Sequence, residues 1–120
     1  MDAYRVLIVE DVQDLANVIY VYLSNKTDAE IVLANSGNQA IDILEHQAIN
    51  LVITDLYMIN GNGVKVIEMA RQLGVDVVIH SGVTKAYELH IPEGVQVLEK
   101  PSKLDDLLDI INEFRAKPAA

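Results

Sequence analysis

The chain has 120 residues and a mass of 13.3 kDa, which is enough for one compact domain but not for two. Its 18 acidic residues against 9 basic residues give a net charge of −9, which argues against the clustered basic surface that nucleic-acid binding requires. It has no cysteine, and no apolar run approaches the roughly 20 residues of a membrane span. We therefore expect a cytoplasmic protein that binds neither nucleic acid nor a membrane.

Five short apolar runs rich in β-branched residues predict β-strands. They recur at fairly even spacing and show no strict alternation of apolar and polar residues, which is typical of strands covered on both faces of a parallel sheet. The runs are Val6–Val9, Ile31–Ala34, Leu51–Thr54, Val75–Ile79 and Val95–Leu98.

Segments with the helical spacing of apolar residues follow four of these runs or precede the next one. They lie at residues 15–23, 40–48, 64–73 and 104–114. The stripe of the first segment consists of Leu15, Val18, Ile19, Tyr22 and Leu23. We expect Gly74 to cap the end of the third segment, and Ser102 and Asp105 to form a capping box at the start of the last.

The connection between the last two strands is unusually short. Only residues 84–90 have helical potential there, and Pro92 and Gly94 then interrupt it, so we expect a shortened fourth helix. Alternating strands and helices predict a single doubly wound α/β domain with a five-stranded parallel sheet. We take the strand order 2-1-3-4-5 from the flavodoxin-like folds. The domain is expected to span residues 1–117, with a tail at 118–120.

Polar side chains follow four of the predicted strands at the point where each strand ends. Glu10 and Asp11 follow the first strand, Asp55 the third, Ser81 the fourth and Lys100 the fifth. In a parallel sheet all carboxyl ends lie on one edge, and ligands bind there at the topological switch point. With this strand order, the three carboxylates meet in one crevice and Ser81 and Lys100 flank it. Each residue alone has an ordinary explanation as a turn or cap, but five at four strand ends do not.

Three carboxylates in one crevice are costly, because a like-charged pair about 4 Å apart repels by roughly 4 kcal/mol at an effective dielectric constant of 20. Lys100 supplies one positive charge, which cannot balance three negative ones. Oxygen ligands with open water positions suit Mg²⁺. A hard cation beside a lysine and a hydroxyl can hold a phosphoryl group, and an aspartate can accept one.

These residues, in this order, resemble the receiver domain of two-component response regulators over the stretch from Arg5 to Arg115. The opening VLIVEDV resembles the hydrophobic strand and acidic pair of that family, and TDLYMINGNG resembles the strand end that carries the phospho-acceptor. VVIHSG and VLEKPS resemble the segments with the family's hydroxyl residue and its Lys-Pro pair. No motif is specific alone, whereas the set is highly specific.

The resemblance implies a role for each residue of the crevice. Asp55 would accept a phosphoryl group from a phosphohistidine. Asp11 would ligate Mg²⁺ directly, and Glu10 would act chiefly through a bound water. The backbone carbonyl of Tyr57 would complete the protein's part of the metal site. Lys100 would contact the acceptor carboxylate and then a phosphoryl oxygen.

The resemblance also implies a switch. The Ser81 hydroxyl would swing in to bond the phosphoryl group and draw its loop along, and the Lys100–Pro101 peptide bond would be cis. The implied protein is a phosphoprotein of two-component signalling rather than an enzyme, since it catalyses only its own phosphorylation and dephosphorylation. Its partners would be a histidine kinase or phosphotransfer protein and a downstream protein target.

Some positions depart from the family pattern. Val97 stands where the family often has a switch aromatic, and a valine cannot rotate a ring into a pocket. His80 replaces a more usual apolar residue, and we interpret it as a partly buried histidine at a strand end. The short segment after Ser81 resembles receivers attached to hybrid sensor kinases more than it resembles DNA-binding regulators.

Three alternatives stay open. A pseudo-receiver would bind partners without phosphorylation. An aspartyl-phosphate phosphatase would need a second acid two residues after Asp55, where this chain has Tyr57. A flavin or nucleotide-binding module would need a phosphate loop rich in Gly, Ser or Thr after the first strand, where this chain has acidic residues.

Overall fold

The computed structural model describes residues 3–56, 58, 63–82 and 94–117. The strands of this part are β1 (Arg5–Val9), β2 (Glu30–Ala34), β3 (Leu51–Thr54), β4 (Asp76–Ser81) and β5 (Gln96–Glu99). The helices of this part are α1 (Gln13–Lys26), α2 (Gly37–His46), α3 (Gly63–Gln72) and α4 (Leu104–Ala116). The shortened fourth helix that we expect near residues 84–90 lies outside the described residues.

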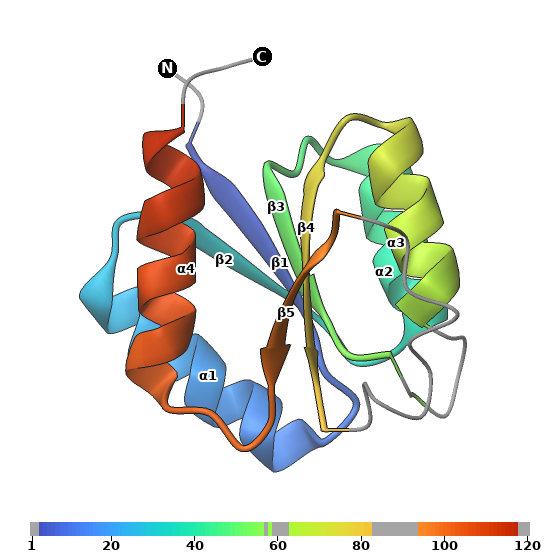
Figure 1. Ribbon diagram of the computed structural model, residues 1–120. Helices are drawn as coiled ribbons and strands as arrows, with labels where there is room; N and C mark the ends of the chain where they lie inside the picture. The colour runs from blue at the N-terminus through green and yellow to red at the C-terminus, as the bar shows by residue number, and fades with distance from the viewer. Residues whose placement is uncertain (1–2, 57, 59–62, 83–93, 118–120) are drawn as a thin grey trace.

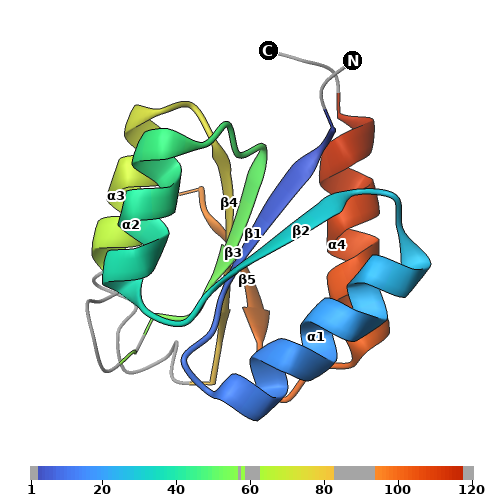
Figure 2. The same cartoon turned by 180° about the vertical axis from the view of Figure 1, so that it is seen from behind.

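The five strands form one parallel sheet in the order β2-β1-β3-β4-β5, which confirms the predicted fold class. Helices α1 and α4 cover one face of the sheet, and α2 and α3 cover the other (Figure 1). The view from behind shows the same three layers (Figure 2). Strand β1 begins beside the C-terminal end of α4. The carboxyl ends of the strands lie together at the other end of the sheet (Figures 1 and 2).

The side chains of the central strands alternate between two hydrophobic clusters. Leu7 and Val9 of β1 pack on the side of α2 and α3, while Val6 and Ile8 pack on the side of α1 and α4. This alternation follows from the pleat of a strand, in which successive side chains point to opposite faces. Burial on both faces is why these strands are almost wholly apolar in sequence.

The edge strands are less covered than the sequence predicted. Burial on both faces holds for β1, β3 and β4, whereas three of the four residues of β5 are exposed and Val97 retains 39% of its accessible surface. The cause is position, because an edge strand has a neighbour on one side only. Strand β4 also runs further than expected: Ser81 is its last residue and pairs with Glu99, instead of following the strand.

Two predictions for the helices were wrong. Val18 does not belong to the buried stripe of α1: its side chain is 52% exposed, and the stripe is Ala16, Ile19 and Leu23. Helix α4 begins after Lys103, whose backbone N–H donates to the Asp106 carboxylate at 2.9 Å. The predicted capping box therefore lies one residue further along the chain.

The prediction for Gly74 was right. Its φ of 72° is the left-handed conformation in which glycine ends helices. The next residue, Val75, donates its backbone N–H to the carbonyl of Ala70 at 2.8 Å, as in the usual glycine cap.

Among the helices that the structure describes, none combines the length and the apolar character that crossing a membrane requires.

Candidate functional site

The ends of β1 and β3 bring three carboxylates together. Glu10 and Asp11 follow β1 directly, Asp55 follows β3, and the two strands are neighbours in the sheet. Sheet hydrogen bonds fix both ends, since the Glu10 N–H donates to the Ala34 carbonyl at 3.0 Å and the Asp55 N–H donates to the Val9 carbonyl at 3.2 Å. The three carboxylates therefore lie together at the predicted switch point.

Lys100 bridges two of these carboxylates. Its Nζ lies 2.6 Å from Glu10 Oε1 and 2.9 Å from Asp55 Oδ2. Glu10 is 2% exposed and Asp55 is 9% exposed, so both ion pairs are screened little by water. Burial lowers the pKa of Lys100, but the hydrogen bonds to Glu10 and Asp55 and their charges outweigh burial and raise that pKa above 10.5. The ammonium group is therefore charged at neutral pH.

The three carboxylates form a potential cation site. Glu10, Asp11 and Asp55 each place an oxygen within 4.8 Å of the others. When ionised, the three carboxylates carry three negative charges. The positive charge of Lys100 balances one of them, and a divalent cation would balance the other two. An all-oxygen donor set of this charge suits Mg²⁺. The residues present therefore fit the metal that the sequence predicts.

Ser81 and Lys100 lie beside each other across β4 and β5. Ser81 is fully buried, and its carbonyl oxygen accepts the backbone N–H of Lys100 at 3.1 Å. The Lys100–Pro101 peptide bond is cis, as the resemblance implies. All five predicted side chains thus lie at the carboxyl edge of the sheet, whereas Tyr57, whose carbonyl we expect to complete the metal site, lies outside the described residues.

Sequence reasoning missed the importance of Gly63. This first residue of α3 lies so close to the backbone after β3 that a Cβ atom there would overlap the Asp55 carbonyl oxygen and lie 2.8 Å from the Leu56 Cα. The Gly63 N–H donates to the Leu56 carbonyl at 3.0 Å. The absence of a side chain at Gly63 allows α3 to start directly against the backbone of Asp55 and Leu56.

Sequence reasoning also missed the partner of His80. His80 is 7% exposed, more buried than the partly buried histidine we predicted, and its Nε2 lies 2.8 Å from the Ser102 hydroxyl. Burial and the nearby Lys100 charge lower the pKa of His80 to about 4, against a smaller opposing effect of Asp55. The ring is therefore neutral at pH 7. This hydrogen bond also explains why Ser102 does not cap α4.

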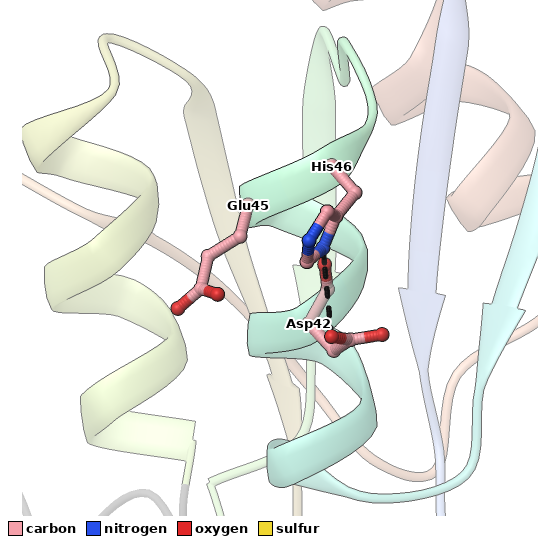
Figure 3. A group of neighbouring side chains, drawn as sticks. All are labelled: Asp42, Glu45 and His46. Atoms are coloured by element: carbon pink, nitrogen blue, oxygen red, sulfur yellow. Dashed lines mark hydrogen bonds and ion pairs between the residues drawn. The ribbon is translucent and has the colours of Figure 1, made fainter.

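A second group of potential metal ligands lies on α2, where Asp42, Glu45 and His46 are all exposed (Figure 3). His46 Nδ1 donates to the Asp42 carbonyl oxygen at 2.8 Å, and this bond and the Asp42 carboxylate raise the pKa of His46. A histidine in the last turn of a helix is stabilised by the helix dipole. We therefore regard this group as a helix-end interaction and assign no ligand to it.

The fold and the crevice together define a flavodoxin-like α/β domain with an acidic cluster, a lysine and a hydroxyl at its switch point. The family model "Response regulator receiver domain" matches residues 6–112, so the chain belongs to the receiver domains of two-component response regulators. These domains are signalling modules that act with histidine kinases or phosphotransfer proteins and with effectors.

Solved structures of this family are similar over nearly the whole chain. A response regulator receiver protein from Pseudomonas putida is 28% identical with a TM-score of 0.79, covering 94% of this chain and 98% of its own. The receiver domain of a putative Luxo repressor protein from Vibrio parahaemolyticus is 27% identical with a TM-score of 0.81, covering 94% and 90%. The receiver domain of the hybrid histidine kinase CckA is 28% identical with a TM-score of 0.76, covering 92% and 97%.

Proposed function

We propose that this chain is a phospho-acceptor switch in which Asp55 takes a phosphoryl group from a histidine kinase or phosphotransfer protein. The observation that carries the proposal is the contact of Lys100 with both Glu10 and Asp55 inside a cluster of three carboxylates. A lysine held there can neutralise charge that develops on a transferring phosphoryl group. The buried Ser81 ends the neighbouring strand β4, and its hydroxyl would bond a phosphoryl oxygen once the end of that strand moves.

Glu10, Asp11 and Asp55 would hold Mg²⁺, together with the carbonyl of Tyr57. The bound metal would neutralise the negative charge that the phosphoryl donor and the acceptor bring together. The Asp55 carboxylate oxygen attacks phosphorus, the bond from phosphorus to the donor nitrogen breaks, and the donor leaves with that electron pair. The product is an acyl phosphate on Asp55.

The direct test is phosphorylation by acetyl phosphate with Mg²⁺, followed by intact-mass spectrometry. We expect the wild type to gain one phosphoryl group, Asp55→Asn to gain none, and both to stay unmodified when a chelator removes the metal. Asp109→Asn is the matched control, because Asp109 is an exposed aspartate on α4 and should leave uptake unchanged. A wild type that takes no phosphoryl group from acetyl phosphate or from phosphorylated phosphotransfer domains would refute the proposal.

The donor would dock on an apolar surface of α1 that borders the crevice. Val12 directly follows the acidic pair and is 54% exposed, and Val18 and Val21 continue the surface along the helix at 52% and 58%. Val18 and Val21 line a groove of about 560 Å³ that reaches Leu104 of α4. Because a phosphohistidine must reach Asp55, its protein must cover the surface next to the crevice.

A substitution that places charge on this surface separates docking from chemistry. We expect Val18→Asp to slow transfer from a phosphorylated phosphotransfer domain about ten-fold, because a buried interface charge is costly, and to leave acetyl phosphate uptake unchanged. Val97→Asp is the matched control, because Val97 is an exposed valine on β5. Equal transfer to all three proteins would show that the donor docks elsewhere.

The other predictions for the chain belong to this proposal. Residues 1–117 would form the domain, and residues 118–120, a tail, lie outside the described part. The protein would act in the cytoplasm on a downstream protein target, and its similarity to the receiver of a hybrid kinase fits an origin in such a kinase. Binding of partners without phosphate uptake would favour a pseudo-receiver, and turnover of p-nitrophenyl phosphate would favour a phosphatase.

A further inference from the structure

We propose that His80 is a positioning residue that holds Lys100 in the crevice through its hydrogen bond to Ser102. The inference rests on the proposed function, since it concerns the lysine of that site. His80 takes no part in the transfer itself. It acts on the short loop that follows β5 and contains Lys100, Pro101 and Ser102.

The hydrogen bond joins two segments that meet at the crevice. His80 precedes Ser81 on β4, and Ser102 lies two residues after Lys100. On the crevice side, the backbone N–H of Lys100 is bonded to Ser81 and its Nζ is bonded to Glu10 and Asp55. The bond from His80 therefore fixes the same loop from its other side, toward α1 and α4.

A cavity makes this single bond important. A space of about 390 Å³ lies behind the loop, lined by Leu15 and Ile19 of α1, His80, Leu104 and Leu107 of α4, and the three loop residues. Where a loop borders a cavity, close packing does not hold it in place, because packed contacts require atoms on both sides. A directional hydrogen bond from a buried, neutral ring then limits the positions that the loop can take.

The consequence for the site is geometric. A shift of about 1 Å in a group that stabilises a transition state can slow a reaction up to about 100-fold. Lys100 reaches the crevice through a flexible side chain, which absorbs part of any shift of its backbone. We therefore expect a moderate effect on phosphorylation, about three- to ten-fold, when the bond is removed.

The experiment compares Ser102→Ala, His80→Leu and the double variant with the wild type. The first readout is the ammonium signal of Lys100 in ¹⁵N–¹H spectra of metal-free protein, which is sharp only when hydrogen bonds hold the group. The second is the rate of Asp55 phosphorylation by acetyl phosphate. We expect each single variant to broaden the signal and slow the rate, and the double variant to be no slower than the slower single one, because both changes remove the same bond.

Two further variants distinguish positioning from general stability. Ser102→Thr keeps a hydroxyl and should restore both readouts. Thr27→Ala removes a hydroxyl that accepts the Ala29 N–H at the opposite edge of the sheet, and it should lower the melting temperature without affecting either readout. If Ser102→Ala keeps a sharp Lys100 signal, the inference about His80 is wrong. A wild type that takes up no phosphoryl group would instead refute the proposed function, and the Lys100 signal would still test the inference.

Discussion

Gly63→Ala tests whether the start of α3 must lie directly against the backbone of Asp55 and Leu56. The added methyl group would overlap the Asp55 carbonyl oxygen and lie 2.8 Å from the Leu56 Cα. Both neighbours are backbone atoms, so no side-chain rotation can relieve the overlap. Either α3 or the segment after β3 must move, and the hydrogen bond from the Gly63 N–H to the Leu56 carbonyl, 3.0 Å long, must lengthen.

The cost follows from these contacts. Overpacking a close-packed site typically costs about 1–3 kcal/mol, while alanine returns at most about 1 kcal/mol over glycine in a helix, and less at its first residue. We therefore expect Gly63→Ala to lower the free energy of unfolding by about 1–3 kcal/mol, with a fall in melting temperature of roughly 4–12 °C. If Asp55 is phosphorylated as proposed, we also expect that reaction to slow about ten-fold or more, because the Asp55 carboxylate is displaced.

The assays are urea unfolding followed by circular dichroism and phosphorylation by acetyl phosphate under conditions in which the variant is folded. Gly82→Ala is the matched control, since among the residues that the structure describes a Cβ atom at Gly82 would meet only the Lys100 Cβ, at an ordinary 3.6 Å. It should change stability by less than about 1 kcal/mol. A Gly63→Ala protein with wild-type stability and a wild-type rate would show that the close approach has no role.

Three further predictions concern charge, pH and helix packing. Lys100→Met should tighten Mg²⁺ binding at least about three-fold in calorimetry, because it removes the positive charge beside Glu10; weaker binding would contradict this. The pKa of His80 is about 4 in the folded protein, against 6.5 for an ordinary histidine, so the unfolded chain takes up this proton at a higher pH than the folded protein does. The neutral His80 therefore contributes fully to stability above pH 6.5, and the free energy of unfolding should fall by about 2–3 kcal/mol as the pH drops toward 4. His80→Phe should lose less stability between pH 7 and 4.5 in urea unfolding, and an equal loss would be contrary evidence. Tyr22→Phe removes the hydrogen bond from α1 to Asp105 of α4 and should cost about 0.5–1.5 kcal/mol in the same assay, whereas no change would show that this exposed bond is not formed in solution.

The parts of the fold that could be predicted from the sequence depend on local pattern. Strand β3 is continuously apolar because both of its faces are buried, so Leu51–Thr54 was predicted with its observed bounds. The meeting of Glu10 and Asp55 could be predicted because parallel strands end on one edge and the strand order of flavodoxin-like folds places β1 beside β3. The first condition follows from the order of elements along the chain, and the second came from the fold family.

The parts that could not be predicted depend on contacts between distant residues. Val18 has the spacing of a buried residue, and only the orientation of α1 on the sheet exposes it. Ser102 has the position of a helix cap, and only the buried ring of His80 explains why its hydroxyl is used elsewhere. An unusual polar residue in a strand was the available signal, since a buried imidazole requires a hydrogen-bond partner.

The charge balance of the crevice indicates how phosphorylation would change the structure. Lys100 is shared between Glu10 and Asp55 while Asp55 is a carboxylate. A phosphoryl group replaces about one negative charge with about two, which draws the ammonium group toward phosphorus and weakens its contact with Glu10. Lys100 cannot move alone, because its backbone is bonded to Ser81 and its loop is bonded to His80. The ends of β4 and β5 would therefore move together, and this movement would reach the surface through the loop that leads into α4.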